Sequence, residues 1–274
     1  MYTQHWKLSS RPFENRCDSH FYYPAELHQA ALLKLHYTIE NRRAAALVCG
    51  PTGVGKSFLI HELRRQLSEP FRGLTNLVFP ALGEAEWLNY LVDAFDSAKS
   101  GSSTGAAHAL SRFERALVQR VDAGTHPTIV VDEAQLLEQY NLLEPLRLLL
   151  NVAADRASGE AAWTLVLVGQ EMTLAHVERY RALDERLAVK CFVGNMKPEE
   201  TEAYIQHRLR AAHGDAAQIF DSEAIEAIEC LSQGVPRRIN RLCDLALMIG
   251  FAEELPRITA DVIDSVHADL AAAN

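Results

Sequence analysis

Long apolar runs and a leader pattern are missing from this sequence of 274 residues. No apolar run reaches the roughly 18 residues that cross a bilayer, and the longest one, residues 245–252, lies between Asp244 and Glu253. The first residues lack the charged-then-apolar order of a secretory signal. We therefore expect a cytoplasmic protein without direct membrane insertion.

Metal-ligand spacings are also missing. The five cysteines form no Cys-x-x-Cys pair, and the eleven histidines form no cluster with ligand spacing. A zinc site or a disulfide framework needs tighter spacing or a secreted context. We expect most of the cysteines to be small buried residues in a reducing compartment.

Excess positive charge is the third absence, because the formal net charge is −9. The charge is uneven: residues 1–197 balance to −1, whereas residues 198–274 balance to −8. Overall acidity argues against a general nucleic-acid coat. The nearly neutral first part still allows a local basic face, so duplex DNA is a possible partner that charge does not favour.

Short apolar runs alternate with helical patterns over the first two thirds of the chain. Strands are predicted at 44–49, 74–79, 128–131, 163–168 and 187–193. Helices are predicted at 57–67, 84–95, 107–121 and 142–154, and the small polar stretch 97–105 predicts a surface loop. This alternation indicates an α/β fold with a parallel sheet flanked by helices.

The strand signal stops at Pro198, and the remainder predicts helices near 198–212, 221–232, 236–250 and 259–271. Asp221 is a predicted N-cap, and Thr259 is expected to serve the last helix in the same way. We predict an α/β core at 41–196 followed by an all-α lid at 197–274.

A glycine-rich motif joins the first of these strands to a helix. Its residues match G-x-x-x-x-G-K-[ST] and are Gly50, Pro51, Thr52, Gly53, Val54, Gly55, Lys56 and Ser57. Glycines let backbone N–H groups converge on phosphate oxygens, and the following helix adds its positive dipole end. Lys56 is expected to reach the β- and γ-phosphates and Ser57 to offer its hydroxyl to Mg²⁺. We assign these residues and Phe58 to ATP binding.

Two later strands end in polar residues that suit hydrolysis. Thr128 to Val131 runs into Asp132 and Glu133, and the strand 163–168 is followed by Gly169 and Gln170. At the carboxyl edge of a parallel sheet, Asp132 would hold Mg²⁺, largely through water, and Glu133 would act as general base on the attacking water. Gln170 could orient that water or the γ-phosphate, although alone it could equally be a turn residue.

Two arginines are candidates for neutralising phosphate charge. Arg186 precedes the strand 187–193, and Arg237 opens a helix after Gly234, Val235 and Pro236. A cation at a helix start opposes the helix dipole, which suggests an anionic neighbour for Arg237.

The order of these motifs resembles AAA+ ATPases. More narrowly, the chain is similar to ExeA/GspA-type ATPases linked to general secretion, a group akin to TniB/TnsC-type transposition regulators. The resemblance covers nearly the whole chain. It includes Pro12-Phe13 and Phe21 near the N-terminus, and His207-Arg208-Leu209 and Pro236-Arg237 in the lid.

The resemblance implies roles for individual residues. It gives Gln170 the sensor-1 position, Arg237 the sensor-2 position, and Arg186 the arginine finger that acts on a neighbouring subunit. Residues 1–40 would form a family-specific segment packing on the core. Within that segment, Phe21 to Tyr23 would pack near the adenine or serve equally as a hydrophobic staple.

The implied function is hydrolysis of Mg-ATP by an ATP-dependent homo-oligomer that assembles or remodels an unidentified protein partner. One alternative is a transposition regulator that oligomerises on DNA and recruits a transposase. A second alternative is a nucleotide-dependent interaction module without turnover, against which Asp132 and Glu133 argue. Secretion members typically continue into a transmembrane helix and a peptidoglycan-binding domain. If the sequence is whole, its end at Asn274 favours a soluble adaptor or a DNA-linked role.

Overall fold

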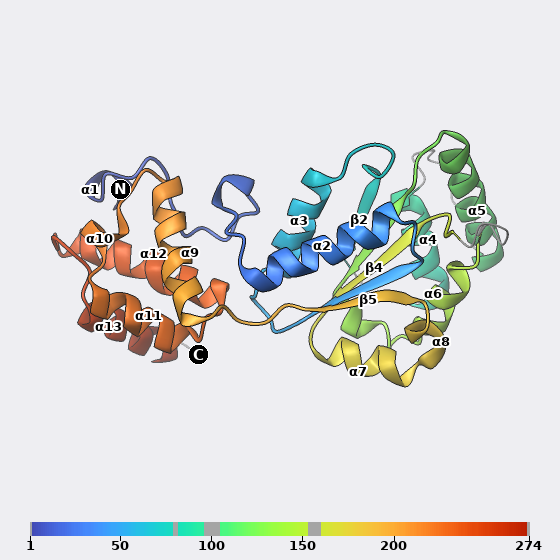
Figure 1. The fold of residues 1–274 in the computed structure, drawn as a ribbon. Coiled ribbons are helices and arrows are strands. Elements are labelled where there is room, and N and C mark those ends of the chain that lie inside the picture. The colour runs from blue at the N-terminus through green and yellow to red at the C-terminus, as the bar shows by residue number, and fades with distance from the viewer. Residues whose placement is uncertain (1, 79–81, 96–104, 153–159, 273–274) are drawn as a thin grey trace. The chain divides into compact units, whose positions relative to one another are not determined.

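The chain forms two compact units, and its strands and helices are drawn in Figure 1. The computed structural model describes residues 2–78, 82–95, 105–152 and 160–272. We call Leu27–Pro51 with Leu59–Val193 the sheet unit, and Met1–Glu26, Thr52–Phe58 and Gly194–Asn274 the helical unit. Three parts of the predicted elements lie outside the described residues, namely Phe79, 97–104 and 153–154.

The sheet unit contains five parallel strands in the order β2-β3-β4-β1-β5. They are β1 (Ala45–Cys49), β2 (Leu74–Val78), β3 (Thr128–Asp132), β4 (Thr164–Gly169) and β5 (Leu187–Phe192). Every residue of β1 and β4 is buried, because helices cover both faces of a parallel sheet. The predicted α/β fold is confirmed, with all five expected strands.

Helices surround this sheet in Figure 1. They are α2 (Glu26–Glu40), α3 (Lys56–Gln66), α4 (Glu84–Phe95), α5 (Ala106–Asp122), α6 (Leu143–Leu149), α7 (Met172–Arg179) and α8 (Arg181–Asp184). Trp87, Phe95, Phe113 and Trp163 belong to the same buried cluster as the inward residues of the central strands. The sequence patterns did not predict α2, α7 or α8, and α6 is shorter than expected.

The helical unit contains the predicted lid. Its helices are α1 (Tyr2–His5), η1 (Ser19–Phe21), α9 (Pro198–Ala211), α10 (Ala216–Ile219), α11 (Ser222–Ser232), α12 (Pro236–Ala252) and α13 (Ala260–Ala272). Asp221 caps α11 as predicted, because its carboxylate accepts a hydrogen bond of 2.7 Å from the Ala224 amide. None of the described helices is both long and apolar enough to span a membrane.

The N-terminal segment differs from our expectation that residues 1–40 pack together on the core. Tyr2, Trp6 and Phe13 belong to the hydrophobic core of the helical unit. The polar tips of the first two find partners on α12: Tyr2 donates to Asp244 at 2.5 Å, and Trp6 donates to the Leu247 carbonyl at 2.9 Å. Only the part from Leu27 onward, which is most of α2, belongs to the sheet unit. The segment is therefore divided between the two units.

Candidate functional site

The glycine-rich loop connects β1 to α3, the strand-to-helix context that the motif requires. Gly53 and Gly55 have φ angles of +89° and +100°, where a side chain is disfavoured. Val54 between them is fully buried and anchors the loop. Lys56 is the first residue of α3 and Ser57 the second, so the side chains and the helix N-terminus that contact phosphate in such loops occupy the expected positions.

Arg237 lies against this loop within the helical unit. Its backbone N–H donates to the Gly53 carbonyl at 3.1 Å. A Cβ added to Gly53 would lie 2.9 Å from the Arg237 Cβ, so the close approach itself requires glycine. Arg237 is exposed at the start of α12. The start of α12 therefore lies beside the glycine-rich loop, and the predicted anionic neighbour of Arg237 stays a prediction.

The aromatic residues Phe21, Tyr22 and Tyr23 have different surroundings. The ring of Tyr22 meets that of Phe58, the third residue of α3, in an edge contact with centroids 5.3 Å apart. Phe21 and Tyr23 instead pack against the hydrophobic core of the helical unit. Tyr22 thus lies against the first turn of α3, and the placement of this segment near the adenine stays a prediction.

Asp132, Glu133 and Gln170 lie at the carboxyl edge of the sheet. The registers pair Cys49 of β1 with Gly169 of β4, and β4 also pairs with β3, which ends at Asp132. Strand β4 therefore lies between β1, which precedes the glycine-rich loop, and β3, which ends at Asp132. Gln170 directly follows β4. Ligands of open α/β sheets bind at such an edge.

The two acids turn away from the strand in a defined geometry. An Asp132 carboxylate oxygen accepts a hydrogen bond of 2.9 Å from the Glu133 N–H. Glu133 has left-handed backbone angles, φ 57° and ψ 36°, and it is exposed. This conformation reverses the chain into the short helix η2 (Ala134–Leu136). Glu133 is thus a carboxylate presented to solvent at the end of a buried strand.

Sequence reasoning missed Gln135 at this edge. Its Nε2 donates to Oε2 of Glu133 at 2.5 Å, and its Oε1 accepts from the backbone N–H of Gln170 at 3.1 Å. The side chain is 8% exposed, so the amide is buried between its two partners. The available signal was a glutamine flanked by Ala134 and Leu136 directly after the acid pair.

Arg186 is exposed directly before β5, which lies at one side of the sheet. Its Nη2 donates to the Asn151 side-chain oxygen at 2.8 Å. Among the described residues Arg186 forms no ion pair with Asp184, whose carboxylate pairs with Lys190 at 2.5 Å.

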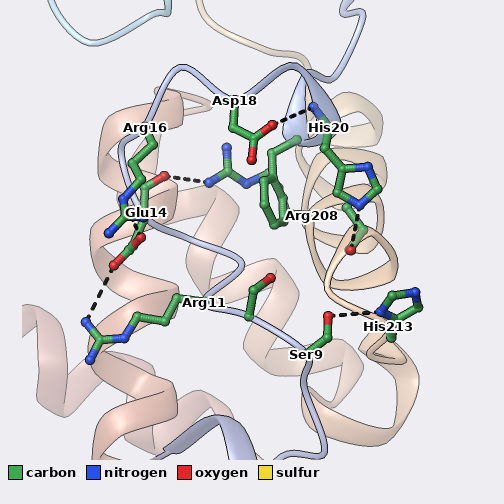
Figure 2. A pocket seen from close by; sticks show the side chains of 11 residues that line it. Ser9, Arg11, Glu14, Arg16, Asp18, His20, Arg208 and His213 are labelled. Atoms are coloured by element: carbon green, nitrogen blue, oxygen red, sulfur yellow. Dashed lines mark hydrogen bonds and ion pairs between the residues drawn. The ribbon is translucent and has the colours of Figure 1, made fainter.

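A pocket of about 650 Å³ lies in the helical unit between the N-terminal segment and α9, and Figure 2 shows its lining. Arg208 reaches into it from α9 with 2% of its surface exposed. Its Nε donates to the Pro12 carbonyl at 2.5 Å and its Nη2 to the Glu14 carbonyl at 2.7 Å. The guanidinium carbon also lies 5.0 Å from the centroid of the Phe21 ring. Arg208 thus fastens the part of the N-terminal segment around Pro12 and Glu14 to helix α9.

A glycine-rich loop between β1 and α3, with an Asp-Glu pair after a neighbouring parallel strand, defines a P-loop nucleotide-binding fold. The family described as AAA domain matches residues 39–177, and the chain belongs to this family. It is also 30% identical over 275 residues to general secretion pathway protein A of Aeromonas hydrophila. That match covers 100% of this chain and 48% of the relative, so the chain spans about half the relative's length.

Solved structures support the same fold. The Aeropyrum pernix ORC2 protein in its ADPNP-ADP complexes matches with a TM-score of 0.67 and 14% identity, over 97% of this chain and 72% of that chain. The RuvB Holliday junction branch migration motor of Thermotoga maritima matches with a TM-score of 0.60 and 17% identity, over 89% of this chain and 69% of that chain. At these identities the likeness concerns the fold.

Proposed function

We propose that this chain is an ATPase that binds Mg-ATP at Gly50–Phe58 and hydrolyses it to drive assembly or remodelling of a partner complex. The observation that carries the proposal is the carboxyl edge of the sheet. There an exposed Glu133 follows the Asp132 that ends β3. A loop that only held nucleotide would not need a second carboxylate at this position.

Binding rests on the loop and on the first turn of α3. Backbone N–H groups of the loop and the helix N-terminus bind phosphate oxygens, and Lys56 contributes the charge that faces the β- and γ-phosphates. Arg237 belongs to this set because its backbone is hydrogen-bonded to the loop at Gly53. In this role it senses the nucleotide from the helical unit.

The oxygen ligands that would hold the metal are the Ser57 hydroxyl, exposed on α3, and the Asp132 carboxylate at the end of β3. A hydroxyl and a carboxylate completed by water form the hard donor set that Mg²⁺ prefers. When bound, Mg²⁺ would neutralise charge on the transferring phosphoryl group.

Hydrolysis is assigned to residues that follow strands. Glu133 accepts a proton from the attacking water as general base, and Gln170 orients that water or the γ-phosphate. Arg186 is proposed to act on the nucleotide of a neighbouring subunit, which makes a homo-oligomer the active form. Its exposure and its place beside β5 support this role.

The partner is proposed to be a protein of an envelope or secretion machine, on the similarity to general secretion pathway protein A. Action in the cytoplasm, where ATP is abundant, fits this proposal. The DNA-regulator alternative receives less support. The basic residues that could serve it are Arg42, Arg43, Arg64, Arg65, Arg208, Arg210, Arg237 and Arg238. Of these, Arg208 is buried, Arg65 pairs with Glu62 at 2.6 Å, and Arg42 pairs with Glu160 at 3.6 Å.

Replacing Glu133 with glutamine tests the proposal. The amide cannot accept the proton of water, while Asp132 and Lys56 are unchanged, so ATP affinity should persist and steady-state turnover should fall by about 10²–10⁴. Glu171→Gln is the matched control, because Glu171 is an exposed acid directly after Gln170. Turnover of Glu133→Gln close to that of Glu171→Gln would remove Glu133 from the role of general base.

A further inference from the structure

The two ends of the Gln135 amide are engaged with two different parts of the candidate hydrolytic site. Its N–H group donates to the Glu133 carboxylate at 2.5 Å, while its oxygen accepts from the Gln170 N–H at 3.1 Å. Glu133 follows β3 and Gln170 follows β4, which are neighbouring strands of one sheet. Gln135 thus connects the carboxylate proposed as base to the peptide group that begins the sensor residue.

The surrounding backbone is shaped for this bridge. The left-handed conformation of Glu133 turns the chain back, so that a side chain two residues later returns to the Glu133 carboxylate. A Cβ at Gly169 would lie 3.1 Å from the Gln135 oxygen and 2.2 Å from the Thr173 hydroxyl. Glycine at the end of β4 therefore leaves the space in which the buried amide lies.

We propose that Gln135 is a positioning residue for ATP hydrolysis. It holds the Glu133 carboxylate in the orientation needed to accept a proton from water, and it ties that orientation to the position of Gln170. The inference rests on the proposed function, in which Glu133 is the general base. A movement of Gln170 on nucleotide binding would be transmitted to the Glu133 carboxylate through the side chain of Gln135.

The chemistry of this position calls for a primary amide. The group must donate to a carboxylate and accept from a backbone N–H at the same time, and the neutral amide of glutamine does both. An ionised glutamate only accepts hydrogen bonds and would place a second negative charge against Glu133. Methionine has a similar length and tolerates burial, but it forms neither bond.

The competing explanation is that Gln135 only fills space at the end of the sheet. In that case its replacement would change stability, or would change binding and turnover together. A positioning role predicts a fall in kcat with little change in KM, because the lost interaction orients the reacting groups rather than the nucleotide. The two explanations therefore differ in which kinetic parameter moves.

The first experiment compares Gln135→Met with Gln119→Met in steady-state ATP hydrolysis. Gln119 is an exposed residue of α5 in the same unit, so it controls for the added methionine. We expect kcat of Gln135→Met to fall by about tenfold to hundredfold, the scale of a misplaced reacting group. KM and ATP affinity should stay within about twofold. A kcat equal to that of Gln119→Met would overturn the inference.

Gln135→Glu has nearly the same shape and tests the donor side of the bridge. The glutamate keeps an oxygen but, when ionised, cannot donate to the Glu133 carboxylate, so kcat should again fall while KM stays within about twofold. If Gln135→Met does not fold, this variant decides the question alone. A kcat equal to that of Gln119→Met would then overturn the inference.

A double variant separates this inference from the function on which it rests. If Gln135 acts through Glu133, adding Gln135→Met to Glu133→Gln should cause no further loss of kcat. Full additivity of the two losses would contradict the positioning role. Turnover that is unchanged by Glu133→Gln would instead contradict the proposed base, so the two failures are distinguishable.

Discussion

Replacement of Arg208 by alanine should loosen the N-terminal segment from the lid helices. In the native protein the guanidinium donates to the carbonyls of Pro12 and Glu14, and it lies over the ring of Phe21. Alanine removes both donors and the cation together. The neighbouring anchors of Tyr2 and Trp6 on α12 are left in place, so we expect local opening rather than loss of the whole unit.

The magnitude follows from the two hydrogen bonds. A bond to a charged group is worth about 1.5–3 kcal/mol, and a cation over an aromatic ring adds about 0.5–1 kcal/mol. Glu14 lines the pocket in Figure 2, so water can reach its freed carbonyl, which places the sum near the lower end. We expect a loss of about 3 kcal/mol, which corresponds to an approximately hundredfold larger population of the open segment.

Native-state hydrogen exchange measures this opening directly. The reporter is the amide of Ser9, which donates to the Ala212 carbonyl at 2.9 Å and thereby records attachment of the segment to α9. Exchange in peptides covering residues 8–16 should accelerate by about hundredfold in Arg208→Ala at constant pH and temperature. Arg208→Lys should be intermediate, because an ammonium on a flexible stem cannot reproduce the planar fork.

Arg210→Ala is the matched control, because Arg210 is exposed on the same helix. A surface substitution of this kind changes stability by less than about 0.5 kcal/mol. If Arg208→Ala and Arg210→Ala show the same exchange over residues 8–16, Arg208 does not fasten the segment, and the reasoning from its two hydrogen bonds fails.

Three further predictions concern other parts of the molecule. Mixing Arg186→Ala subunits with Lys56→Ala subunits should restore some hydrolysis, since one composite site has both an intact finger and an intact loop. No recovery at any ratio, with hydrolysis independent of protein concentration, would exclude action in a neighbouring subunit. Burial, with a smaller effect from Arg42, lowers the pKa of His126 from 6.5 to about 4. The stability that neutral His126 contributes is therefore complete above pH 6.5 and is lost toward pH 4, by at most about 3 kcal/mol. Urea unfolding across this range should show the loss in the wild type and less of it in His126→Gln, and equal slopes would contradict the assignment. Duplex DNA should bind at most modestly, only with ATP, and should dissociate steeply with salt, because residues 198–274 balance to −8. Tight, nucleotide-independent binding at physiological salt would favour the DNA-regulator alternative.

The parts of the site that sequence predicted are those encoded by neighbouring residues. Gly50 to Ser57 form one continuous motif, and Asp132 with Glu133 directly follows an apolar run, so local pattern sufficed to place them after strands. Strands β1, β3 and β4 were predicted for the same reason, because a buried parallel strand is a continuous apolar run. Strands β2 and β5 are partly exposed and were predicted from mostly apolar runs. The roles of these residues and of Arg237 stay predictions.

The parts that sequence did not predict depend on distant partners. Arg208 and Pro12 are 196 positions apart, and Tyr2 and Asp244 are 242 positions apart, so no local window connects them. The bridge made by Gln135 depends on the left-handed turn at Glu133 and on the space left at Gly169 of another strand. Helices α8 and α10 have four residues each, too few to show a helical period.

The helical unit is built from three separated segments of the chain, and this limits how the protein can be divided. Expression of residues 194–274 alone would remove Tyr2, Trp6 and Phe13 from the cluster that they share with α9 and α12. Apolar side chains such as Ile205 and Leu247 would then face water, which favours aggregation. Truncation after Val193 would leave the same aromatic side chains without their partners. A functional dissection of this protein therefore calls for point substitutions in the full chain rather than separate domains.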